Sequence, residues 1–287
     1  MVTASVNYRV GSARVTRIPE TSMEIAPARL YVNWRDVMRE NGSVIVDDEN
    51  EEPLTISVHT WVVEYNGRTV VVDTGVGNMK ERSFSPPFHH LNTPYLQKLE
   101  AMGVYPEKVD LVLLTHLHTD HIGWNTYHDG VQWRPTFPNA RYIFSQAELD
   151  FFKSPAAEER HQVIFEDSIK PVIDNGKYET VSATGGVFEG FRFHPTPGHS
   201  VGHMSISFGS DGENALFTGD VAHNPIQIYY PELTSIFCAD GGRARMSRLW
   251  VMNYGADHNA TLFTAHFPET SAGKISNNGK GFEWSYV

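Results

Sequence analysis

Short hydrophobic runs separated by turn residues predict a series of β-strands. Residues 55–65 and 68–73 are rich in β-branched and apolar side chains, and Asn66-Gly67 lies between them. Asn-Gly supplies the positive φ angles of a two-residue turn, so the two runs predict a β-hairpin. Further short runs of this kind, each predicting a buried or half-buried strand, lie at residues 110–115, 190–194, 215–218 and 261–264.

Helix start and stop signals lie between these runs. Pro94 is suited to the first turn of a helix that Gly103 ends. Ser145 and Glu148 have the spacing of a capping box, which predicts the start of a second short helix.

Two more helices are predicted in the second half of the chain. Ser154-Pro155 opens one that runs towards Lys170, and the other covers about residues 242–255. We expect the arginines of the last helix to form a solvated face: Arg243, Arg245 and Arg248. Strands that alternate with helices in this way are typical of an α/β fold.

The least regular segment covers residues 18–53. It contains Pro19, Pro27, Trp34 and an acidic run at residues 47–52, for which we expect a solvated loop. We predict that residues 1–287 form one domain and that this segment is an N-terminal decoration of it.

Composition narrows the classes of partner. The net charge is −11 and lysine and arginine do not cluster, which argues against nucleic acid as a partner. No apolar stretch has the length of a signal peptide or a membrane span. The single cysteine, Cys238, forbids an internal disulfide and fits a reducing compartment. We therefore expect a cytoplasmic protein that acts on a small molecule; a homodimer is an open possibility.

Four potential metal ligands follow the predicted strand at residues 110–115. They are His116, His118, Asp120 and His121. The carboxyl ends of parallel strands are where open α/β sheets bind ligands. Imidazoles and carboxylates without a thiolate suit zinc, iron, manganese or cobalt, and two such ions can share a bridging hydroxide. A six-residue run cannot complete such a site, so further ligands are expected downstream.

Suitable residues follow three later strands. His199, Asp220 and His266 each come after one of the predicted runs, so different strands could deliver them to one edge of a sheet. The remaining isolated histidines are expected to be ordinary core or surface residues: His89, His90, His128, His161 and His258.

The ordered motifs HxHxDH, Pro-Gly-His, Thr-Gly-Asp and Ala-His resemble those of the metallo-β-lactamase-fold hydrolase superfamily over about residues 55–268. The resemblance implies a four-layer αβ/βα sandwich with a dimetal site at one edge of its two sheets. It implies two divalent ions, with zinc first and iron, manganese or cobalt as alternatives. By the superfamily's pattern one ion is held by His116, His118 and His199, the other by Asp120, His121 and His266, and Asp220 bridges them.

The same resemblance assigns supporting roles to two other residues. Asp73, in an Asp-Thr-Gly corner after the hairpin, would orient a ligating imidazole through its second ring nitrogen. His203 would lie behind the ligands without binding an ion.

Gly123-Trp124-Asn125 after the ligands is similar to the branch that holds N-acyl homoserine lactonases and methyl-parathion-hydrolase-like enzymes. That branch implies a hydrolase that opens a lactone or cleaves a carboxylic ester by attack of a metal-bridging hydroxide, with Asp120 as acid–base. A phosphotriesterase with the same site is the alternative. A metal-stabilised binding protein without turnover is a third hypothesis.

Lactonases of this branch commonly carry a tyrosine three residues after the bridging aspartate, and His223 stands at that position here. We predict that His223 lies near the substrate, while Tyr229 or Tyr230 reaching into the site, or a different substrate, are the alternatives. Residues 18–53 and 221–237 are the two segments expected to form a substrate wall or a dimer contact.

Overall fold

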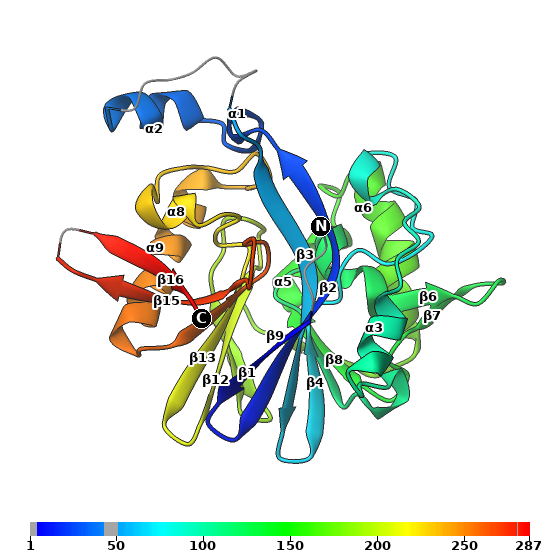
Figure 1. The fold of residues 1–287 in the computed structure, drawn as a ribbon. Helices are drawn as coiled ribbons and strands as arrows, with labels where there is room; N and C mark the ends of the chain where they lie inside the picture. Colours follow the sequence, from blue (N-terminus) through cyan, green and yellow to red (C-terminus); the bar gives the residue numbers. More distant parts are fainter. Residues whose placement is uncertain (1–4, 43–50, 280) are drawn as a thin grey trace.

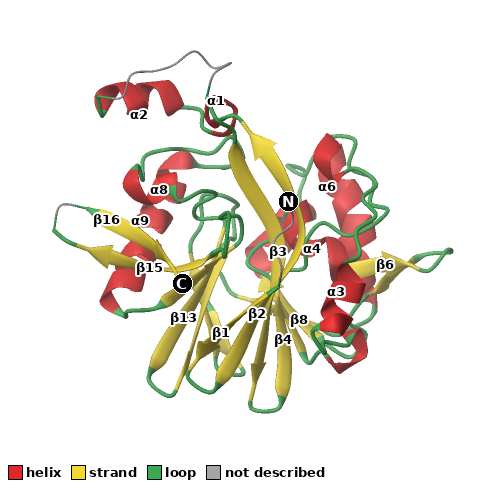
Figure 2. Cartoon of the chain, viewed as in Figure 1, coloured by secondary structure: helices red, strands yellow, loops and turns green. Residues whose placement is uncertain are grey.

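The computed structural model describes residues 5–42, 51–279 and 281–287 (Figure 1). The described residues form two seven-stranded sheets that lie face to face, with helices over both outer surfaces (Figure 2). The predicted four-layer αβ/βα sandwich is therefore confirmed. No helix among the described residues is long and apolar enough to cross a membrane.

The first sheet begins with antiparallel strands and continues with parallel ones. Its order is β1 (Val6–Val10), β2 (Ala13–Ile25), β3 (Leu54–Tyr65), β4 (Arg68–Val72), β5 (Leu111–Leu113), β8 (Arg141–Ser145) and β9 (Tyr178–Val181). The predicted hairpin is confirmed, because β3 and β4 are antiparallel and Tyr65 pairs with Arg68 across the Asn-Gly turn. From β4 to β9 the pairing is parallel.

The second sheet contains the strands that precede the later candidate ligands. Its order is β10 (Gly186–Phe188), β11 (Phe191–Pro195), β12 (Met204–Ser210), β13 (Glu213–Gly219), β14 (Thr261–Thr264), β15 (Ala272–Asn277) and β16 (Phe282–Tyr286). β13 and β14 are parallel, and the other neighbours are antiparallel. A short hairpin of β6 (Thr126–His128) and β7 (Trp133–Pro135) projects from the side of the molecule (Figure 1).

The helices are α1 (Pro27–Leu30), α2 (Trp34–Glu40), α3 (Tyr95–Ala101), α4 (Thr119–Ile122), α5 (Gln146–Phe152), α6 (Glu159–Ile164), α7 (Lys170–Asp174), α8 (Ile226–Tyr229) and α9 (Gly241–Asp257). Single turns of 3₁₀-helix cover Pro86–Phe88, Pro106–Lys108 and Gly123–Asn125, and a π-helical turn, Phe165–Ile169, joins α6 to α7.

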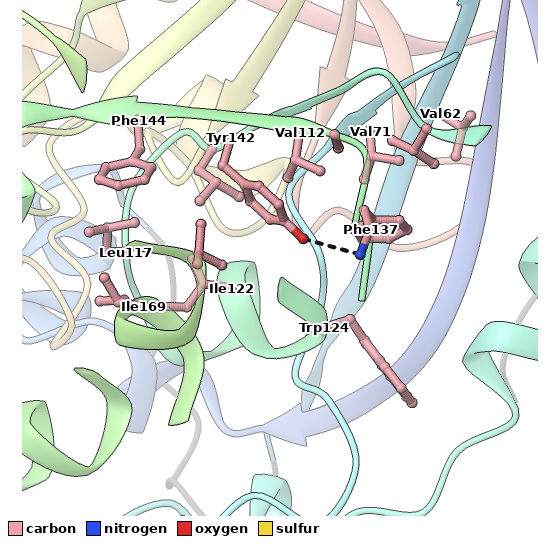
Figure 3. Close-up of a cluster of buried hydrophobic side chains, with 14 of the residues drawn as sticks. Val62, Val71, Val112, Leu117, Ile122, Trp124, Phe137, Tyr142, Phe144 and Ile169 are labelled. Carbon is pink, nitrogen blue, oxygen red and sulfur yellow. Dashed lines mark hydrogen bonds between the residues drawn. The ribbon is translucent and has the colours of Figure 1, made fainter. Parts of the chain in front are cut away.

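Alternating side chains of β5 serve two different cores. Val112 points towards the helices, where it packs with Leu117, Tyr142 and Phe144 (Figure 3). Leu111 and Leu113 point the other way, into the core between the sheets. Both faces of the strand are buried, which is why its sequence is continuously apolar rather than alternating.

The second sheet contributes the other half of the inter-sheet core and one face of a third core. Phe193, Phe217 and Phe263 lie between the sheets. On the outer face Leu216 and Leu262 pack against α9. Packing on both faces of the second sheet therefore holds β13 and β14 in place. Each of these strands is followed by a candidate ligand.

The third predicted helix begins later than expected and is not continuous. The segment after Pro155 stays non-helical up to Glu158, whose side chain caps α6 in a capping box with His161. The helix then passes through the π-turn before α7. The π-turn points Asp167 and Ser168 into the interior, where both are buried. The Ser154-Pro155 pair, from which this helix was predicted, does not indicate that polar groups farther along the helix face inward.

The solvated face predicted for the last helix is wrong for one of its arginines. Arg248 is only 1% exposed, and its guanidinium donates to the backbone carbonyls of Val221, Pro231 and Leu233. Arg243 and Arg245 are exposed, as predicted. The buried arginine fastens the loop that follows β13 to α9.

The segment predicted to be irregular, residues 18–53, begins inside the first sheet. β2 runs on to Ile25 and pairs with β3 along its whole length, apart from one irregularity at Pro19. Beyond it, Leu30 and Trp34 pack with Leu233 in the loop after β13. Most of the acidic run, residues 47–50, lies outside the described residues.

The central phenylalanine of the inter-sheet core offers a test of this architecture. We expect Phe217→Ala to lower the free energy of unfolding by about 3–5 kcal/mol, because it leaves a cavity where the two sheets pack. Urea denaturation of the ion-free protein measures the change. Val131→Ala is the control, since Val131 is 86% exposed and its truncation should change stability by less than about 0.5 kcal/mol. Equal small effects in both variants would contradict the assigned core.

Candidate metal centre

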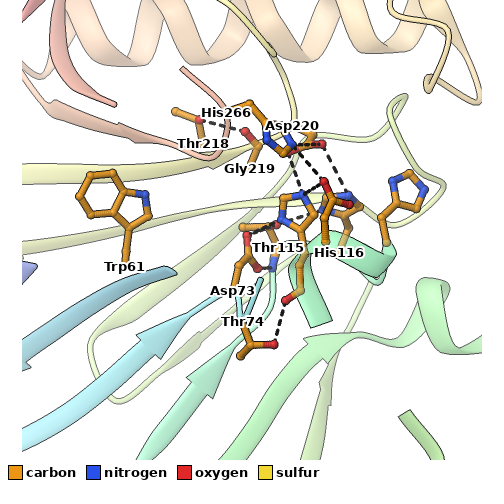
Figure 4. A network of polar contacts seen from close by, with 12 residues as sticks. Trp61, Asp73, Thr74, Thr115, His116, Thr218, Gly219, Asp220 and His266 are labelled. Carbon is orange, nitrogen blue, oxygen red and sulfur yellow. Dashed lines mark hydrogen bonds and ion pairs between the residues drawn. The ribbon is translucent and has the colours of Figure 1, made fainter. Parts of the chain in front are cut away.

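Strand ends from both sheets bring the predicted ligands to one edge of the sandwich. His116 follows β5, and α4 presents Asp120. On the second sheet His199 follows β11, Asp220 follows β13, and His266 follows β14. The labelled residues among them gather between the ends of strands from the two sheets (Figure 4). Thus the structure brings together the residues that the sequence motifs had marked.

Three histidines form one group of potential ligands. His118 Nδ1 lies 2.8 Å from His199 Nε2. The ring centroid of His116 lies 4.5 Å from that of His118 and 4.9 Å from that of His199. One ring nitrogen from each histidine falls within a 4.8 Å cluster, which is compact enough for a single ion. We call this set the three-histidine group.

Asp120, His121 and His266 form a second group beside the first. Asp120 Oδ2 lies 3.6 Å from His266 Nε2 and 3.9 Å from His121 Nε2. We call this set the mixed group. It combines nitrogen and oxygen donors, a donor set that suits several first-row divalent ions.

Asp220 lies between the two groups. Its Oδ2 is 3.2 Å from His199 Nε2 and 2.9 Å from His266 Nε2, while its Oδ1 is 3.2 Å from His121 Nε2. One carboxylate therefore faces histidines of both groups, as the bridging role predicted from the motifs requires.

Local backbone geometry aims Asp220 into this position. The pairing of β13 with β14 shifts register between Phe217 and Gly219, and such irregularities re-aim side chains at the ends of strands. Gly219 has φ +56°, and a Cβ there would lie 2.4 Å from His203 Nε2. That nitrogen accepts the backbone N–H of Asp220 at 2.8 Å. His203 thus supports the aspartate from behind, in the place expected for it.

The outward ring nitrogens of three histidines also have partners. His121 Nδ1 lies 2.9 Å from Asp73 Oδ2, His266 Nδ1 donates to the carbonyl of Ser57 at 2.8 Å, and His116 Nδ1 lies 3.1 Å from Thr115 Oγ1. A partner on the outer nitrogen fixes both the tautomer and the orientation of a ligating imidazole. The predicted orienting role of Asp73 agrees with this contact.

The inward atoms fit a divalent ion. His116 Nε2, His121 Nε2 and Asp220 Oδ1 are buried and make no hydrogen bond of good geometry among the described residues, although His121 Nε2 and Asp220 Oδ1 face each other at 3.2 Å. Buried polar atoms without partners are rare because each costs free energy. Neutral imidazole nitrogens and a carboxylate oxygen are ligands that zinc, iron, manganese and cobalt accept.

Electrostatics also favours positive charge here. Burial lowers the pKa of His116 and His199 well below the usual value, so both rings are neutral and able to bind a metal. Burial opposes charge on His121 too, but nearby carboxylates, chiefly Asp220, raise its pKa well above the usual value. Burial alone would raise the pKa of Asp220, but His121, His266 and His199 hold it well below the usual value. The buried carboxylate thus requires a cation, and a divalent ion would supply that charge.

His223 lies against the same carboxylate. Its Nε2 is 3.6 Å from Asp220 Oδ2, and its ring stacks on His266 with a centroid separation of 5.5 Å. Both of its ring nitrogens are buried without a hydrogen-bond partner in the described part of the chain. Burial lowers its pKa to about 3, so the ring is neutral.

The tyrosines proposed as alternatives to His223 point elsewhere. The hydroxyl of Tyr229 accepts the backbone N–H of Trp284 at 3.4 Å, on the C-terminal hairpin. Tyr230 packs against the hydrophobic cluster around Leu30 and Leu233. Of the three candidates after the bridging aspartate, His223 is the one beside the metal groups.

Three contacts at this site had no signal in the sequence. Arg82, buried and paired with Asp167 of the π-turn, donates from Nε to the hydroxyl of Thr119 in α4. Cys238 Sγ lies 4.0 Å from His199 Nδ1. Glu148, expected to cap its own helix, reaches the loops of the three-histidine group instead. All three depend on contacts between distant parts of the chain.

The chain is similar to several known proteins. Residues 55–266 match the family model described as the metallo-beta-lactamase superfamily. An N-acyl homoserine lactonase, AttM from Rhizobium radiobacter, is 26% identical over 250 residues, which cover 80% of this chain and 89% of the relative.

Two solved structures share the fold over the whole chain. The hydrolase AbOPH of the beta lactamase superfamily superposes with a TM-score of 0.80 at 24% identity, covering 100% of this chain and 98% of that one. AidC, a dizinc quorum-quenching lactonase, superposes with a TM-score of 0.79 at 21% identity, with the same coverage.

The contact between Asp73 and His121 can be tested apart from turnover. We expect Asp73→Asn to weaken ion binding at the mixed group about 10–100-fold, because the amide no longer fixes the ring through a charged acceptor. Competition with a chromophoric chelator measures the stepwise affinities. Asp110→Asn is the control, since this exposed carboxylate accepts the N–H of Thr69 at the opposite end of β5. An unchanged affinity at the mixed group would contradict the orienting role of Asp73.

Proposed function

The chain belongs to the metallo-β-lactamase superfamily, and from that premise we propose that it is a two-metal hydrolase that opens lactones or cleaves carboxylic esters. The observation that carries the proposal is the position of Asp220. Its single buried carboxylate faces both metal groups, so one residue would hold two ions side by side. Zinc is the expected metal, in keeping with the donor set.

The three-histidine group would hold one ion and the mixed group the other. Asp220 would bind both ions. Two bound divalent ions would supply hydroxide at neutral pH and polarise the bond under attack. The remaining chemistry belongs to side chains of the chain. Outer partners such as Asp73 and Ser57 keep the imidazoles from rotating while charge develops in the site.

Asp120 is the carboxylate placed to move a proton. Its side chain is 16% exposed, whereas that of Asp220 is 3% exposed and surrounded by histidines. A more open carboxylate can reach both the attacking oxygen and the departing one. We assign Asp120 the acceptance of the proton released on attack and its delivery to the leaving alkoxide.

His223 is placed to bind the substrate rather than to transfer a proton. A ring with a pKa of about 3 is neutral throughout the physiological range, so it can donate one N–H without carrying charge. In the proposed role that N–H stabilises the oxygen on which negative charge develops during attack. Its unpartnered ring nitrogens support this assignment.

A lactone is favoured among the possible esters by two relatives. AttM is an N-acyl homoserine lactonase, and AidC is a dizinc quorum-quenching lactonase crystallised with N-hexanoyl-L-homoserine, its product. The same residues would also serve a phosphotriester, because the nucleophile and the proton carrier do not depend on whether carbon or phosphorus is attacked. The proposal takes lactones as the preferred class, and the alternative is an outcome of the test.

Substrate class is tested by proton release. The zinc-loaded protein is given acyl lactones, aryl esters and an aryl phosphotriester at matched concentration, and a pH indicator records the rate. We expect the highest kcat/KM with lactones. A preference for the phosphotriester would favour the alternative, and no turnover of any of these substrates would contradict the proposed hydrolase for all three classes.

The role of Asp120 is tested within the same assay. Asp120→Asn should lower kcat about 10²–10⁴-fold because the amide cannot accept a proton. Without bound ions, the unfolding midpoint should stay close to that of the starting protein. His258→Gln is the control, since His258 is exposed and follows the C-terminal end of α9. Retention of full turnover by Asp120→Asn would contradict the assignment.

His223→Phe separates substrate binding from metal binding. We expect kcat to fall about 10²–10³-fold, as for the loss of one donor to a developing oxyanion, with two ions still bound per chain. Atomic absorption on the purified variant gives the metal content. Loss of one ion would show that His223 is a ligand, and unchanged turnover would show that it does not contact the substrate.

A further inference from the structure

We propose that Glu148 is a positioning residue for the three-histidine group: its carboxylate holds together the two loops that carry His116, His118 and His199. The inference rests on the proposed function, because it presumes that this group binds an ion. Glu148 is not part of the sequence motifs that predicted the metal ligands.

The carboxylate of Glu148 bridges two loops from different sheets. Its Oε2 accepts the backbone N–H of Leu117 at 3.1 Å, and its Oε1 accepts that of Gly202 at 2.7 Å. Leu117 lies between two of the histidines, after β5 of the first sheet. Gly202 comes three residues after His199, beyond β11 of the second sheet. The carboxylate of Glu148 therefore fixes the distance between the two loops.

The burial of Glu148 makes these contacts costly to lose. The residue is 1% exposed, and the described residues place no lysine or arginine in an ion pair with it. A buried carboxylate is tolerated only where hydrogen bonds compensate for lost hydration, and the two backbone amides provide them.

Gly202 shows how closely the second loop is seated on the start of α5. A Cβ at Gly202 would lie 2.6 Å from Ser145 Oγ and 2.9 Å from the backbone nitrogen of Glu148. Ser145 Oγ is buried and caps nothing, which leaves the serine as a small residue against which the loop can pack. The close approach therefore requires glycine on one side and a small side chain on the other.

Glu148 acts on a loop whose histidine, His199, has only a weak partner on its outer ring nitrogen. His121 and His266 are oriented through their outer nitrogens by Asp73 and a carbonyl oxygen. The outer nitrogen of His199 faces Cys238 Sγ at 4.0 Å, and a thiol is a weak partner. For His199 the backbone of its loop, rather than a strong partner on the ring, must carry the positional constraint.

The test compares ion affinities of the two groups. Glu148→Gln keeps the shape of the side chain but sets an amide N–H₂ against one of the two backbone N–H groups. Stepwise zinc affinities are measured by chelator competition in two backgrounds, His266→Ala, which leaves the three-histidine group intact, and His118→Ala, which leaves the mixed group intact. We expect Glu148→Gln to lower affinity about 10–100-fold in the first background and to leave it unchanged in the second.

Cobalt provides a spectroscopic readout in the same first background. The d–d absorption of cobalt reports ligand geometry, so a displaced loop should change the band shape as well as the affinity. Gly202→Ala is a second variant that moves the loop without altering charge, and it should reproduce the loss at the three-histidine group.

Glu20→Gln is the matched control. Glu20 is also a buried carboxylate, and it accepts the N–H groups of Val76 and Gly77 and the indole N–H of Trp124. It should lower thermal stability as Glu148→Gln does, but leave the affinity of the three-histidine group unchanged. That difference separates positioning of the ligands from general support of the fold.

Two results would overturn the inference. One is an unchanged three-histidine affinity in Glu148→Gln, and the other is an equal loss at both groups, which would assign Glu148 to general stability. If the starting protein binds two ions but hydrolyses no substrate, the proposed function fails while the positioning role is still decided by these affinities. If the three-histidine group of the starting protein binds no ion, both proposals fail.

Discussion

The buried carboxylate of Asp220 is the constraint on which the site depends. A negative charge at this depth is stable only if positive charge or strong donors surround it. Histidines from both metal groups point ring nitrogens at it, and a backbone N–H fixed by His203 has directed the aspartate towards them. The sheets, the register irregularity at the end of β13 and Gly219 all serve to place this one side chain.

The residues around the ligands explain how the side chains of the site are oriented. Each loop that carries a histidine is tied to a different part of the fold: Asp73 at the end of β4, Ser57 on β3, and Glu148 at the start of α5. The backbone also joins the sheets directly, since Met204 N–H donates to the carbonyl of Thr115 at 2.8 Å. A rigid frame of this kind orients the imidazoles towards a common point before an ion arrives.

The sequence was sufficient for what depends on local pattern. The hairpin at Asn66-Gly67, the apolar strands and the candidate ligands at their ends all follow from short stretches, and the structure has them in the predicted places. It was insufficient where a residue acts at long range. Ser145 and Glu148 have capping-box spacing, but the carboxylate acts 31 and 54 residues away along the chain. Arg248 was predicted to be exposed to solvent. Its partners are backbone carbonyls, and a pattern of side chains in the sequence does not reveal such contacts.

The most direct test of this account is a crystal structure of the metal-loaded protein with anomalous data collected on both sides of the zinc edge. The account predicts two zinc peaks per chain, one beside the three-histidine group and one beside the mixed group, with the carboxylate of Asp220 between them and in contact with both. A single peak, or two peaks of which Asp220 contacts only one, would contradict the central claim that this buried aspartate organises a two-metal site.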